Sequence, residues 1–137
     1  MYDRILVPVD LAHADKLTRA LDTAVTLGKP NGATLIYVGV APTVPGPAGR
    51  NPEEFATRLR AFADGQHALH GLPVDSETIV SHDPSIDLRD KLVQAARDRD
   101  VDLVVMATHV PGMADNWFKG NAAHVAQHAP MSVFVVR

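Results

Sequence analysis

The sequence predicts an α/β fold built on an open parallel sheet with helices on both faces. Short apolar runs alternate along the chain with segments in which apolar residues recur every three or four positions, the patterns of strands and amphipathic helices. The apolar runs lack regular polar residues, so both faces of most strands should be buried. Crossover helices return the chain to the same end of the sheet, which makes the strands parallel.

Five strands are expected, four within short apolar runs and the third in a segment whose apolar residues alternate loosely. The first is almost continuously apolar and ends at Asp10, and the fourth has the strongest strand pattern. The fifth is apolar nearly throughout, so at a sheet edge it would present backbone groups that need a partner. The expected strands are residues 5–9, 33–40, 74–81, 101–107 and 131–136.

Four helices are expected between these strands. Gly28 and Pro30 are stop signals for the first, and Pro52 suits the first turn of the second. Ser85 and Asp87 can cap the third. The expected helices are residues 14–27, residues 52–69, a segment that carries Leu88, Leu92, Val93 and Ala96, and residues 120–128. The pattern leaves open the conformation of the proline-rich segment 41–52.

Length and composition restrict the class of protein. A chain of 137 residues with 46% hydrophobic content suits one domain, residues 1–137, with a real core. The absence of cysteine excludes disulfides and thiolate chemistry. A net charge of −3 without a basic tract argues against nucleic acid as a partner. Neither a signal peptide nor a membrane-spanning run is found, so we expect a cytoplasmic protein without membrane contact.

A ligand site is expected at the carboxyl ends of the strands, where open α/β sheets bind ligands. Asp10 follows the first strand, and an unusually long connection follows Met106. Gly120 and Asn121 open a helix whose amides could bind an anion, with Lys119 adding a positive charge. Two simpler interpretations stay open. Asn121 could be only a helix cap, and Asp10 could only cap the following turn.

Other candidate chemistry has less support. His124 and His128 are spaced like a zinc-binding pair on a helix, but no third ligand is evident near them, and we predict no metal site. His67 and His70 form a similar pair without a carboxylate. Neighbours in sequence such as Ser81, His82 and Asp83 do not usually form a catalytic triad, and no nucleophile elbow is present.

Three segments together resemble the universal stress protein family. They are residues 5–10 (ILVPVD), residues 101–109 (VDLVVMATH) and residues 120–136 (GNAAHVAQHAPMSVFVV). The resemblance covers the whole chain. It implies a three-layer, Rossmann-like sheet of five strands in the order 3-2-1-4-5 with four helices. It also implies dimerisation through the last strand, here with Met131, Val133 and Val135, and, in one branch, binding of ATP or related adenine nucleotides.

The nucleotide-binding branch carries a Gly-x2-Gly-x9-Gly-(Ser/Thr) motif in the long connection. The spacing matches here, with Ala107, Val110, Gly120 and Asn121 at the four motif positions, so one of the four is kept. Valine at the second position adds a branched side chain where backbone would approach phosphate. The nucleotide-binding residues that the resemblance implies are Pro8, Val9, Asp10, Val40, Met106, Ala107, His109, Val110, Lys119, Gly120, Asn121 and Ala122.

The resulting hypothesis is a homodimeric sensor or regulator in the stress response that binds ATP or AMP, with Mg²⁺ if the ligand is a triphosphate, and an unidentified protein partner. No other cofactor is expected. An alternative is a dimeric interaction protein that has lost nucleotide binding, and a third interpretation is a slow ATP hydrolase. A monomer whose edge strand is covered by a loop also stays open.

Overall fold

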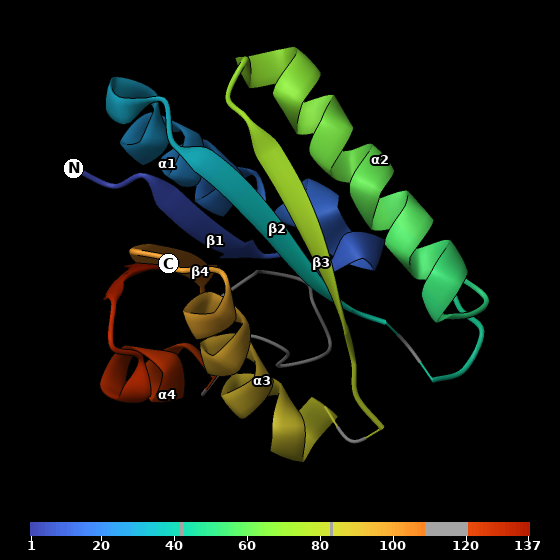
Figure 1. Cartoon of the computed structure of the whole chain (residues 1–137). Helices are drawn as coiled ribbons and strands as arrows, with labels where there is room; N and C mark the ends of the chain where they lie inside the picture. The colour runs from blue at the N-terminus through green and yellow to red at the C-terminus, as the bar shows by residue number, and fades with distance from the viewer. Residues whose placement is uncertain (42, 83, 109–120) are drawn as a thin grey trace.

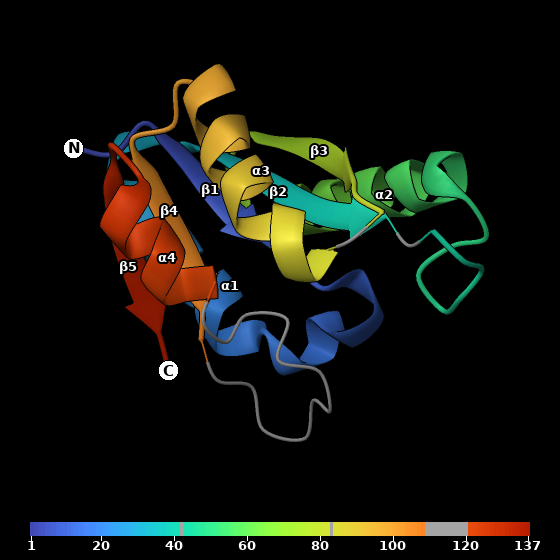
Figure 2. The ribbon, with the colours of Figure 1, turned by 90° about the horizontal axis from the view of Figure 1, so that it is seen from below.

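The computed structural model describes residues 1–41, 43–82, 84–108 and 121–137. Five parallel strands form one sheet in the order β3-β2-β1-β4-β5, which confirms the predicted fold class and strand order. Helices α1 and α2 cover one face of the sheet, and α3 and α4 pack side by side on the other (Figures 1 and 2). The molecule therefore has three layers.

The strands lie within two residues of their predicted bounds. They are β1 (Arg4–Pro8), β2 (Thr34–Ala41), β3 (Val74–Val80), β4 (Leu103–Ala107) and β5 (Ser132–Val136). The three inner strands β2, β1 and β4 are almost wholly buried, as expected for strands covered on both faces. The edge strands β3 and β5 are more exposed.

The first helix differs from the prediction. Instead of one helix over residues 14–27, the chain forms a 3-10 segment η1 (Leu11–Lys16) and then α1 (Thr18–Gly28). Leu17, which joins them, has non-helical backbone angles and is 2% exposed. The apolar periodicity continues through this junction, so the pattern did not reveal the break. A second 3-10 segment, η2 (Lys29–Asn31), ends at Gly32 with a φ of 61°.

The second helix confirms its predicted start. In α2 (Pro52–His70), Pro52 occupies the first turn and the Asn51 side chain accepts a hydrogen bond from Glu54 N at 2.8 Å. The preceding segment 43–51 closes on itself through reciprocal hydrogen bonds between Gly46 and Gly49 at 3.1 Å. Arg58 of α2 donates to the Pro47 carbonyl at 2.7 Å and ties this turn to the helix.

The last two helices pack together on the other face. Helix α3 (Pro84–Asp98) begins one residue before Ser85, so Ser85 lies inside the first turn and is not the cap we predicted. Pro84 can open the helix because the first turn needs no backbone donor. Helix α4 (Asn121–His128) leads into β5. Within the described part of the chain, no helix is both long and apolar enough to cross a membrane.

The core between β2 and α2 depends on a close contact at Gly39. A Cβ at this position would lie 2.7 Å from Cζ and 3.0 Å from Cε1 of Phe55, which is 1% exposed. Two turns further along α2, the Phe62 ring meets Tyr37 edge-to-face with centroids 5.4 Å apart. Burial raises the pKa of the Tyr37 hydroxyl above its usual range. Aromatic rings of α2 thus pack directly on the backbone and side chains of β2.

We expect Gly39→Ala to destabilise the protein by about 1 to 3 kcal/mol, because the new methyl group would overlap a buried ring. Urea denaturation followed by circular dichroism measures the change. In a double-mutant cycle, Phe55→Leu should recover part of the loss because leucine does not reach as far as Cζ. Strictly additive effects of the two substitutions would contradict this account of the contact.

Candidate functional site

Backbone pairing between β1 and β4 stops before either strand ends. We call the place beyond Leu6 and Val104 where this pairing stops the division. Val9 N–H donates to the Val38 carbonyl at 2.8 Å, so odd-numbered residues of β1 direct their backbone groups towards β2. Even-numbered residues face β4, where the Arg4 carbonyl accepts from Asp102 N at 3.0 Å. Pro8 is an even-numbered residue and has no N–H to donate. Accordingly, the described β1–β4 pairing covers Ile5 with Leu103 and Leu6 with Val104.

The division lies where the order of the strands reverses. The chain runs from β1 outwards through β2 to β3 on one side, and β4 and β5 lie on the other. A crevice at such a switch point, at the carboxyl ends of the strands, is where open α/β sheets bind ligands. The structure therefore brings together the carboxyl ends of β1, β2 and β4, which carry Asp10, Val40 and Ala107.

Asp10 stands at the carboxyl end of β1, one residue past Val9, and its side chain is 20% exposed. Its Oδ2 lies 2.9 Å from Nδ1 of His13 in η1, and its carbonyl accepts from His13 N at 3.0 Å. Its carboxylate makes no cap hydrogen bond to η1. A carboxylate has several lone-pair positions, so its pairing with one histidine leaves capacity for a ligand hydroxyl or amino group.

The other described candidate residues divide into two groups. Pro8, Val9, Met106, Ala107 and Ala122 are buried, so they can form the wall of a crevice and offer backbone groups but little side-chain surface. Asp10, Val40 and Asn121 are partly exposed. Asn121 is the first residue of α4, whose N-terminal amides carry partial positive charge. His109, Val110, Lys119 and Gly120 lie outside the described residues.

Two residues at these strand ends were missed by the sequence prediction. His13 pairs with Asp10, and Thr108 follows β4 and donates its N–H to the Val136 carbonyl at 2.9 Å. Thr108 is partly exposed next to Ala107. The three-residue spacing between Asp10 and His13 is typical of a turn contact, but the apolar periodicity that predicts a helix over residues 14–27 does not reveal the 3-10 turn that brings the two residues together.

His67, His124 and His128 make polar contacts outside the candidate site. His124 Nε2 lies 3.1 Å from Asp90 Oδ1 in α3, and the rings of His124 and His128 stack with centroids 4.1 Å apart. His128 Nδ1 donates to the His124 carbonyl at 2.9 Å. His67 Nδ1 donates to the Leu72 carbonyl at 2.7 Å at the end of α2. Among the described residues, no group of three or more His, Asp or Glu side chains could hold a metal ion.

Ser81 follows β3 and is 1% exposed. Its Oγ has no hydrogen-bond partner in the part of the chain that the structure describes, whereas His82 is exposed. Ser81 and His82 therefore do not form the hydrogen-bonded pair that an activated serine nucleophile needs. Asp83 lies outside the described residues.

Solved structures with the same fold include complexes with nucleotides. A universal stress protein in complex with cAMP matches with a TM-score of 0.68 and 22% identity, over 99% of this chain and 97% of that chain. The universal stress protein from Archaeoglobus fulgidus in complex with dAMP matches with a TM-score of 0.67 and 21% identity, over 99% and 98% of the two chains. At these identities, the likeness establishes the fold.

Sequence relatives extend over the whole chain. Universal stress protein G from Shigella flexneri is 30% identical over 149 residues, covering 100% of this chain and 100% of the relative. Universal stress protein G from Salmonella typhimurium is 29% identical with the same coverage. The model of the universal stress protein family matches residues 1–137. The chain therefore belongs to the universal stress protein family.

Proposed function

We propose that this protein binds an adenine nucleotide, ATP or AMP, at the division between β1 and β4 and acts as a regulator or sensor in the stress response. The observation that carries the proposal is the division itself. It lies at the switch point of the sheet, and the Asp10 carboxylate lies next to it at the carboxyl end of β1. The nucleotides named in two structures of the same fold, cAMP and dAMP, support an adenine ligand.

The proposed roles follow from the chemistry of each group. The Asp10 carboxylate accepts hydrogen bonds from ribose hydroxyls, and the backbone around Val40 pairs with the edge of the base. The amides at the start of α4, with Gly120 and Asn121, bind phosphate, and Lys119 adds a positive charge. Mg²⁺ accompanies the ligand if it is a triphosphate. Ligand binding would then change the surface that the protein presents to a partner protein.

We expect Asp10→Ala to weaken AMP binding about tenfold or more, because a charged acceptor of ribose hydrogen bonds is removed. Isothermal titration calorimetry with ATP, ADP and AMP in the presence of Mg²⁺ measures the affinities. Asp15→Ala is the matched control, since Asp15 is exposed in η1, which directly follows Asp10, and its loss changes the charge equally. Wild-type protein that gives neither heat nor a thermal shift at millimolar nucleotide would overturn the proposal.

Val110→Gly tests whether the motif departure limits phosphate binding. Glycine removes a branched side chain at a position where the family motif has glycine, so ATP affinity should rise while adenosine affinity stays the same. The same calorimetry compares the two ligands. Equal ATP affinity in the variant and the wild type would refute the steric explanation. No binding by either protein would favour the alternative, an interaction protein without a nucleotide.

A second proposed property is dimerisation through β5. This strand forms one edge of the sheet, and its Phe134 and Val135 are 45% and 39% exposed. Of the three residues named from the sequence, Met131 and Val133 are partly exposed and Val135 is exposed. Phe134 also lines a groove of about 640 Å³ against α1, together with Leu27 and Thr23. An apolar edge of this kind favours pairing with a second copy.

We expect Phe134→Glu to shift the protein towards the monomer, because a carboxylate would have to be desolvated in the paired edge. Light scattering coupled to size exclusion gives the mass over a range of concentrations. Leu69→Glu is the control, since Leu69 is 73% exposed on α2, away from β5. A wild-type mass equal to that of one chain at every concentration would exclude the dimer.

A further inference from the structure

The second edge of the sheet, β3, has its own set of outward backbone groups. Leu35 N–H donates to the Pro73 carbonyl at 2.9 Å, so odd-numbered residues from 73 onwards direct their backbone groups towards β2. Ser76, Thr78 and Val80 therefore direct theirs away from the sheet. In an unprotected edge strand these groups are a template on which another strand can pair.

Side chains bind several of these outward groups. The Asp75 carboxylate accepts from Ser76 N at 2.8 Å, and the Ser76 carbonyl accepts from Arg99 Nη2 at 3.5 Å. Further along the strand, Lys91 Nζ of α3 donates to the Val80 carbonyl at 2.7 Å. Three outward groups of β3 thus have side-chain partners, and two of the side chains reach over from α3 or from just beyond its end.

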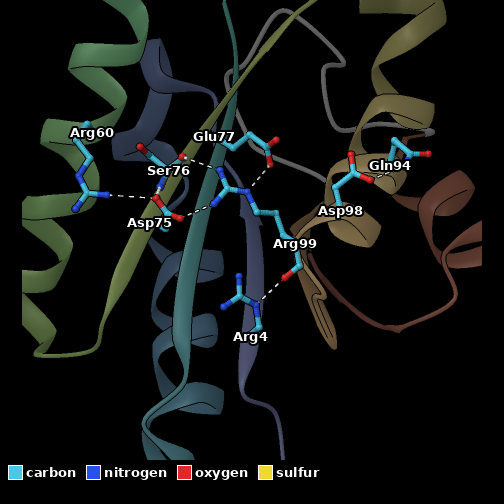
Figure 3. A network of polar contacts seen from close by, with 8 residues as sticks. All are labelled: Arg4, Arg60, Asp75, Ser76, Glu77, Gln94, Asp98 and Arg99. Carbon is cyan, nitrogen blue, oxygen red and sulfur yellow. Dashed lines mark hydrogen bonds and ion pairs between the residues drawn. The ribbon is translucent and has the colours of Figure 1, made fainter.

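Arg99 is the centre of this arrangement, as Figure 3 shows. Its guanidinium hydrogen-bonds to the Asp75 carboxylate, and its Nε lies 3.3 Å from Glu77 Oε2, an ion pair without hydrogen-bond geometry. The Arg99 carbonyl accepts from Arg4 Nε of β1 at 2.6 Å. On the other side, Arg60 of α2 reaches Asp75 Oδ1 at 3.4 Å. The network joins elements from both faces of the sheet at its β3 edge.

The charge state of Asp75 agrees with this role. Burial opposes the charged carboxylate, but the hydrogen bonds from Ser76 N and Arg99, with the charges of Arg99 and Arg60, outweigh it and lower the pKa of Asp75. Asp75 is therefore ionised in the network across the physiological range. The two arginines that hold it lie on different layers, so the carboxylate is held from both sides.

The opposite edge differs in composition. Strand β5 reads Ser-Val-Phe-Val-Val and has no charged residue, whereas β3 contains Asp75 and Glu77. Charged side chains at an edge strand are a common protection against strand addition, because pairing would desolvate them. The two edges of one sheet are thus unequally protected.

We propose that Asp75, Arg99 and Lys91 form an edge lock that closes β3 to strand addition by a second copy of this chain. The lock works by competition, since an incoming strand must displace the side chains that bind Ser76 and Val80 before it can pair with them. Assembly is then confined to the β5 edge. Two copies that pair through their β5 strands have no further open edge, so they form a dimer and not a filament. This inference does not depend on nucleotide binding.

The test is the double variant Lys91→Ala with Arg99→Ala, examined by light scattering coupled to size exclusion. We expect species larger than those of the wild type, with at least about a twofold rise in mean mass at high concentration, because two carbonyls of the edge become available. The control is Arg89→Ala with Arg97→Ala, which removes the same charge from exposed positions of α3. The control should keep the wild-type mass.

A third variant separates strand pairing from partial unfolding. Thr78→Pro, added to the Lys91 and Arg99 double variant, removes an outward N–H at a position where an edge strand tolerates proline. If pairing at β3 causes the larger species, this addition should return the mass to that of the wild type. Larger species that persist with proline, or a folded double variant with the wild-type mass, would overturn the proposal. Circular dichroism establishes folding in each case.

Discussion

The central strand β1 is hydrogen-bonded on both sides, and one of these ladders ends at the place where open α/β sheets bind ligands. Its odd-numbered residues bond to β2, and Val9 continues that ladder past the end of the strand. Its even-numbered residues face β4, where Pro8 cannot donate. The strands are packed by helices on both faces, so the remaining route to the strand ends is from the carboxyl edge.

The candidate site combines this backbone feature with a short polar pair. Asp10 lies at the mouth of the division because β1 ends there, and the 3-10 turn that follows brings His13 back to its carboxylate. Val9, Met106 and Ala107 are buried at the carboxyl ends of β1 and β4, where the proposed ligand would meet an apolar surface. At the carboxyl ends of β1, β2 and β4, the partly exposed residues that can offer polar groups to a ligand are thus few, namely Asp10, Val40 and Thr108.

The two edge strands of the sheet, β3 and β5, differ in how their outward backbone groups are protected from pairing. At β3, the charged side chains of Asp75 in the strand, of Lys91 in α3 and of Arg99 just beyond α3 bind backbone groups that would otherwise be open to pairing. At β5, apolar side chains remain partly exposed beside a groove on α1. A parallel sheet that is covered on both faces still has two edges, and in the proposed assembly this unequal protection would let the sheet associate at β5 but not at β3.

By itself, the sequence determined the elements, their alternation and the burial of the inner strands, because hydrophobic periodicity is a local property. The similarity of residues 5–10 and 120–136 to a family supplied the strand order. The junction at Leu17 escaped prediction because the apolar pattern continues across it, and the start of α3 was placed too late because Pro84, before Ser85, opens the helix. Only the tertiary structure decided where β1 and β4 part, that His13 holds Asp10, and that Arg99 reaches Asp75. These features depend on hydrogen-bond direction and on contacts between separate elements, which no local pattern encodes.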